Sequence, residues 1–90
     1  MTLDDAFLNW LQIKMVCQAR PEDIPAQDTE QFFMKILSED HQVTSVKIEE
    51  DDTMVHVHFS VAEKRKLKMF PKDLVYHLIT QIEKEPRYGM

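Results

Sequence analysis

The sequence contains very little glycine or cysteine. Gly89 is the only glycine among 90 residues, whereas loops that cradle phosphate groups need several glycines close together. A nucleotide-binding P-loop and a dinucleotide-binding fingerprint are therefore excluded. Cys17 is the only cysteine. This excludes an intramolecular disulfide and cysteine-rich zinc modules, and it favours a reducing compartment.

Long apolar runs and a basic leader are also missing. No apolar run approaches the length of a membrane span, and Met1 to Asp5 is acidic where a secretory signal would be basic. We therefore expect a cytosolic protein without a membrane partner. The net charge of −5 argues against nucleic acid as the main partner, because phosphate binding depends on cationic groups.

The composition that is present is typical of a globular protein. Hydrophobic residues make up 43% and charged residues 30% of the chain, far from the composition of disordered proteins. A chain of 90 residues predicts one domain spanning residues 1–90. A domain of this size buries a limited core, so a partner subunit can matter for its stability.

Residues 2–19 are predicted to form a first helix, because Thr2 and Asp5 resemble a capping box. Its apolar residues form two rows instead of the single stripe of a surface helix. One row is Leu8, Leu11, Met15 and Ala19; the other is Ala6, Trp10, Ile13 and Cys17, with Leu3 and Phe7 between them. We propose that Phe7, Trp10, Ile13 and Cys17 form a face that binds a second copy of the protein or another partner. The alternative is that the second helix covers this row.

Two prolines, Pro21 and Pro25, make residues 20–28 a connector. Asp28 is then expected to cap a second helix that ends near residues 38–40. Its apolar face is formed by Phe32, Phe33, Ile36 and Leu37.

The remaining chain predicts an antiparallel meander and a last helix. In residues 44–48, Thr44, Val46 and Ile48 form the inward set of a strand, and residues 49–53 form a turn. Residues 54–61 alternate strictly, so Val55, Val57, Phe59 and Val61 should face the core while His56 and His58 face outward. Residues 66–70 are a possible third strand. Pro71 should begin the last helix and Pro86 should end it.

These elements predict an α+β fold with two layers. An antiparallel meander of two or three strands packs against three helices in the order α-α-β-β-(β)-α. A parallel sheet is disfavoured, because strands and helices do not alternate.

Two histidines form a candidate metal site. The i, i+2 spacing of His56 and His58 puts both imidazoles on one face of a strand, about 6–7 Å apart. A zinc, copper or nickel site would need further donors, for which the candidates are His41, His77, Glu49 and Glu63. The alternative is that both are ordinary polar residues on a solvated face.

Charged residues cluster in two segments. The basic segment Lys64, Arg65, Lys66, Lys68 and Lys72 is a candidate phosphate-binding surface, although no ladder of aromatic residues accompanies it. Its alternative is a solvated edge strand, where lysines prevent unwanted strand pairing. The acidic segment 49–52 should lie at the opposite end of the meander, which gives the sheet an electrostatic polarity suited to a partner with complementary charges.

The sequence favours binding over catalysis. No serine lies in a nucleophile-elbow context, and Cys17 falls within the apolar pattern of a helix. We therefore expect no enzyme activity and no cofactor. The leading hypothesis is a cytosolic protein-interaction module, regulatory or adaptor-like, that binds another protein or a second copy of itself. Nucleic-acid binding through the basic segment and metal binding through His56 and His58 are the alternatives.

Overall fold

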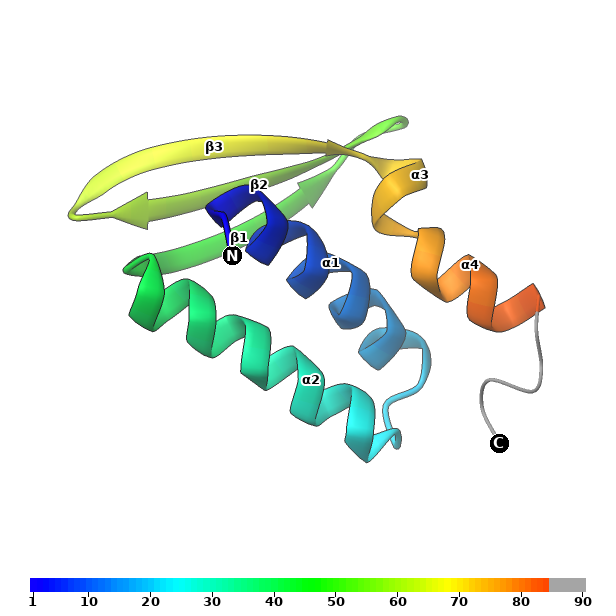
Figure 1. The fold of residues 1–90 in the computed structure, drawn as a ribbon. Helices are drawn as coiled ribbons and strands as arrows, with labels where there is room; N and C mark the ends of the chain where they lie inside the picture. The colour runs from blue at the N-terminus through cyan, green and yellow to red at the C-terminus, as the bar shows by residue number, and fades with distance from the viewer. Residues whose placement is uncertain (85–90) are drawn as a thin grey trace.

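The computed structural model describes residues 1–84 and places three strands against a layer of helices (Figure 1). The helices are α1 (Leu3–Ala19), α2 (Ile24–Lys35), α3 (Lys72–Val75) and α4 (His77–Lys84), and a π-helical turn, η1 (Ile36–Asp40), follows α2. The strands are β1 (Val43–Glu50), β2 (Met54–Val61) and β3 (Lys64–Pro71), paired antiparallel in the order β1-β2-β3. The predicted α+β fold class and element order are confirmed.

The starts of α1 and α2 follow from capping side chains. The Thr2 hydroxyl accepts a hydrogen bond from the Asp5 backbone N–H, as predicted for α1. α2 begins at Ile24 and not after Asp28, so the prediction for its start was wrong. Asp23 accepts from the Ala26 N–H, and Pro25 lies in the first turn, where its missing N–H breaks no helical bond.

The last helix is divided in two. Tyr76 separates α3 from α4 because its backbone leaves the helical region, with φ −90° and ψ 2°. Its hydroxyl donates to Oε1 of Glu50 at 2.5 Å, which ties this break to the end of β1. The predicted helix end at Pro86 lies outside the described residues. Within the described residues, no helix is both long and apolar enough to cross a membrane.

A bulge in β1 changes which residues face the core. Thr44 pairs with Ser60 and Lys47 with His58, so two residues of β1 oppose one of β2. The bulge contains Ser45, whose φ is 55°. Val43 is buried and Thr44 is exposed, which corrects the inward position predicted for Thr44.

The core lies between α1 and the inner face of the sheet. The Phe7 ring packs against the Phe59 ring with 4.8 Å between centroids, and its centroid is 6.4 Å from that of Trp10. Each element contributes at least one buried apolar side chain: Ala6, Phe7, Trp10, Leu11, Met15, Val16, Ala26, Leu37, Val43, Val55, Val57, Phe59, Phe70, Val75 and Ile79. The inward positions predicted for Val55, Val57 and Phe59 are therefore confirmed.

In strand β3 the apolar residues Leu67 and Met69 face away from the helices. Lys66 pairs with Phe59 and Lys68 with Val57, so these lysines lie on the helix-facing side of the sheet. Lys68 forms an ion pair with Asp4 at the start of α1. Leu67 is consequently on the opposite side, beside His58.

Candidate functional site

The candidate site is the face of the sheet that points away from α1 and α2 (Figure 1). We call it the outer face. It includes Lys47 and Glu49 from β1, Met54, His56 and His58 from β2, and Arg65, Leu67 and Met69 from β3. Cross-strand pairing arranges its centre as two rows, Lys47–His58–Leu67 and Glu49–His56–Met69.

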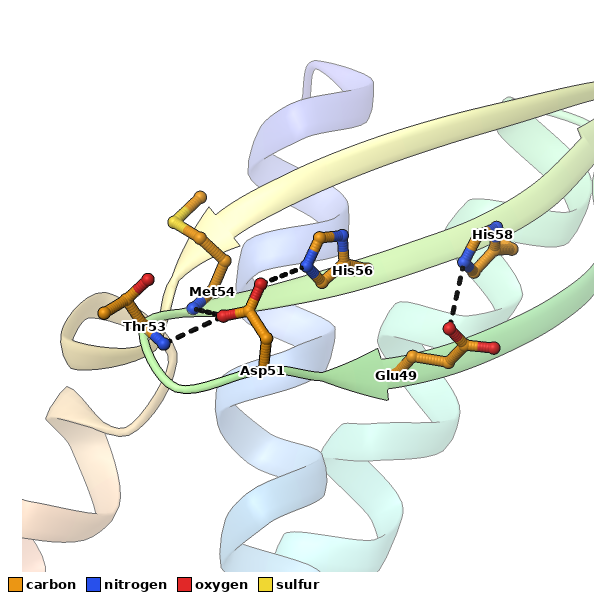
Figure 2. Close-up of polar contacts among 6 residues, drawn as sticks. All are labelled: Glu49, Asp51, Thr53, Met54, His56 and His58. Atoms are coloured by element: carbon orange, nitrogen blue, oxygen red, sulfur yellow. Dashed lines mark hydrogen bonds and ion pairs between the residues drawn. The ribbon is translucent and has the colours of Figure 1, made fainter.

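Asp51 holds His56 in place at one end of the outer face. Oδ2 of Asp51 accepts a hydrogen bond from Nε2 of His56 at 2.7 Å (Figure 2). Oδ1 accepts from the backbone N–H groups of Thr53 at 2.8 Å and Met54 at 2.6 Å. The hydrogen bond from His56, followed by those from the two backbone groups, lowers the pKa of Asp51 to about 2. One carboxylate therefore shapes the β1–β2 turn and orients an imidazole.

Glu49 forms a second pair with His58 in the neighbouring row. Nε2 of His58 lies 3.6 Å from Oε2 of Glu49 (Figure 2), and Nζ of Lys47 lies 3.3 Å from Oε1 of the same carboxylate. The hydrogen bond and positive charge of Lys47, and then the charge of His58, lower the pKa of Glu49. Both imidazoles thus have their own carboxylate and lie on the outer face, as predicted.

The two histidines do not assemble a metal-binding cluster. No group of three or more His, Cys, Asp or Glu side chains within residues 1–84 is placed to hold a metal ion. Nε2 of His41 lies 3.1 Å from the backbone oxygen of Met1. His77 lies in α4, away from the sheet (Figure 1). A first-row metal site with fewer than three protein donors is weak, so the geometry gives the metal hypothesis no support.

The structure divides the basic segment among different surfaces. Lys64, Lys66 and Lys68 occupy helix-facing positions of β3, and Arg65 occupies the outer face. Lys68 is paired with Asp4, and Lys72 follows the opposite end of the strand. The five cations therefore do not form one continuous phosphate-binding surface, which weakens the nucleic-acid hypothesis.

The partner face predicted on α1 requires correction. Phe7 is 0% and Trp10 3% exposed, so neither ring is available to a partner. Nε1 of Trp10 donates to Oε1 of Glu30 in α2 at 3.2 Å, which means that the second helix covers this ring. The prediction failed because the two apolar rows contact the chain's own sheet and α2.

Ile13 and Cys17, the other two predicted partner residues, are half-buried in the C-terminal half of α1. Ile13 lines a groove of about 490 Å³ between α1, α2 and α4, together with Val16, Ala26 and Leu78. Burial, and then the charges of Glu30 and Asp23, raise the pKa of the Cys17 thiol, so this residue is a poor nucleophile.

The residues that sequence reasoning missed are Leu67 and Met69. Each is 50% exposed, and the two lie beside His58 and His56 on the outer face. The signal that would have found them is the short turn after Val61. A two-residue turn pairs Val61 with Lys64, and this pairing fixes the side of the sheet for every residue of β3.

Comparison with known proteins adds no assignment to this geometry. The chain matches no protein-family model, no curated protein and no solved structure.

Proposed function

We propose that the chain is a cytosolic protein-interaction module of regulatory or adaptor type, which binds its partner through the outer face of the sheet. The observation that supports this proposal is the placement of Leu67 and Met69. Both side chains are half-exposed at adjacent outward positions of one strand, about 6–7 Å apart.

The surroundings of these two side chains resemble the make-up of a protein interface. Interfaces typically combine an apolar centre with a polar rim. Here the apolar bodies of the His56 and His58 rings extend the centre across β2, and Lys47, Glu49 and Arg65 supply charges around it.

The histidine–carboxylate pairs serve binding in this proposal and not chemistry. Asp51 and Glu49 restrict the rotamers of His56 and His58. Side chains that are already ordered lose less conformational entropy when a partner binds. The outer face is therefore organised before contact.

Position-specific photo-crosslinking tests the proposal. A photoreactive phenylalanine analogue at position 67 should capture a partner polypeptide in the source cells, whereas the analogue at position 24 should not. Ile24 is the matched control because it is 58% exposed and lies on α2.

The captured protein is then purified, and its affinity for full-length variants is measured by calorimetry. Leu67→Asp should weaken binding by about tenfold or more, because a charge replaces an apolar contact in a buried interface. Ile24→Asp should leave binding unchanged. Equal capture at both positions, or equal affinity for both variants, would contradict the proposal.

A further inference from the structure

The outer face has opposite charges at its two ends. The acidic turn, residues 49–52, contains four consecutive carboxylates, and its Glu49 lies on the outer face. The basic turn, residues 64–66, contains three consecutive cations; its Arg65 lies on the outer face, whereas Lys64 and Lys66 occupy helix-facing positions. The β1–β2 turn lies at the α3 end of the sheet and the β2–β3 turn at the far end (Figure 1). Strand β2 separates them by about 23 Å.

We infer that the partner of the outer face is a second copy of this chain. The two outer faces pack together about a two-fold axis that lies between the sheets and runs at right angles to the strands. This inference rests on the proposed function of the outer face. A two-fold axis between the sheets and across the strands reverses strand direction, so the acidic turn of each copy lies over the basic turn of the other. An axis parallel to the strands would place like charges together.

The same axis brings the central residues of one outer face against the central residues of the other. It keeps β3 over β3 and exchanges the two central rows, because the axis passes between them, level with Val57. Leu67 therefore meets Met69 of the second copy, and Lys47 meets Glu49. Apolar side chains contact apolar ones, and opposite charges are matched, which is the self-complementarity that an isologous interface requires.

The size of the face limits the area that this association can bury. Three strands of eight residues, about 4.8 Å apart and about 26 Å long, present on the order of 400 Å² per copy. Stable complexes bury about 800 Å² per partner. The dimer is therefore weak and reversible, and it depends on salt because its charged ends remain near water.

Analytical ultracentrifugation of the full chain measures this association. The weight-average mass should rise toward that of a dimer between about 10 μM and about 1 mM, the range of weak interfaces. The rise should diminish when sodium chloride increases from about 0.02 M to about 0.5 M, because the Debye length shortens. A monomer at every concentration and salt would overturn the inference.

Charge exchange tests the orientation. One variant carries Lys64→Glu and Arg65→Glu, so both ends are acidic; another carries Glu50→Lys and Asp52→Lys, which makes the acidic turn neutral and leaves Glu49 to meet Lys47. Each variant alone should remain monomeric at low salt, and an equimolar mixture should form heterodimers. A variant that self-associates like the wild type, or a mixture that does not associate, would overturn the inference.

Further controls distinguish loss of association from misfolding, and failure of this inference from failure of the proposed function. Circular dichroism checks that each variant is folded. Glu22→Lys with Asp28→Lys is the control for the variant with added lysines, because it makes the same charge change on exposed positions away from the sheet. If the chain is a monomer but position 67 crosslinks a different protein, the second-copy inference fails and the proposed function stands. If neither association nor crosslinking occurs, both fail.

Discussion

The turn between β2 and β3 offers a sharp test of the structure, because two residues other than glycine adopt left-handed backbone conformations there. Ala62 has φ 52° and Glu63 φ 67°. These angles match a type I′ hairpin turn, which favours Asn followed by Gly. A left-handed residue with a Cβ costs about 1–2 kcal/mol. We therefore expect the double variant Ala62→Asn, Glu63→Gly to stabilise the protein.

The magnitude of that gain follows from two opposing effects. Relief of both positions contributes about 2 kcal/mol, and the larger entropy of glycine in the unfolded chain removes about 1 kcal/mol. The net increase in the free energy of unfolding is about 1 kcal/mol, which raises Tm by about 4–8 °C for a domain of this size. Thermal unfolding followed by circular dichroism measures the shift.

A matched variant separates backbone strain from charge. Glu63→Gln removes the carboxylate and keeps the Cβ, so it should change the free energy of unfolding by less than about 0.5 kcal/mol. An unchanged or lower Tm for the double variant would refute the reasoning, because it would mean that positions 62 and 63 are not left-handed.

Three further predictions concern stability and ionisation. Asp51→Asn should lower Tm most above pH 4 and least near pH 2, as thermal unfolding at a series of pH values would show. The pKa of Asp51 is about 2 in the folded protein and 3.8 ordinarily, so the ionised carboxylate stabilises the fold above pH 4 and this stabilisation is lost as the pH falls to 2. Phe7→Ala should cost about 3–5 kcal/mol in urea unfolding, since the ring is fully buried, whereas Phe32→Ala on the exposed surface should cost less than about 1 kcal/mol. Absorbance titration should show Tyr76 ionising near pH 12, a transition that Tyr76→Phe removes and Glu50→Gln moves to lower pH, because the hydrogen bond to Glu50 is the main cause of the raised pKa.

Strand β2 was predictable because its sequence carries the information locally. Strict alternation of valines and a phenylalanine with polar residues gave the bounds 54–61 and the burial of Val55, Val57 and Phe59. Strand β3 has an equally clear alternation, but the same pattern misleads there. Alternation gives the period of a strand and leaves open which set faces the core. In β3 the hairpin register decides this, and it places Lys66 on the helix-facing side of the sheet and Leu67 on the outer face.

The candidate site was predictable only in part for a related reason. The outward histidines follow from β2 alone, whereas their neighbours from β1 and β3 depend on register and on the bulge at Ser45. The apolar surface of α1 was visible in the sequence, but what covers it was not. Trp10 is covered by α2, through a hydrogen bond to Glu30 that no local sequence pattern indicates.

The lysines on the inner side of β3 have a consequence for fibril formation. A foreign strand that paired with this edge would lie beside β3 in the plane of the sheet, and its helix-facing side chains would pack next to Lys66 and Lys68. Apolar side chains of that strand would remove water from the ammonium groups, which is energetically unfavourable. This border of the sheet therefore resists the strand-by-strand growth that produces amyloid.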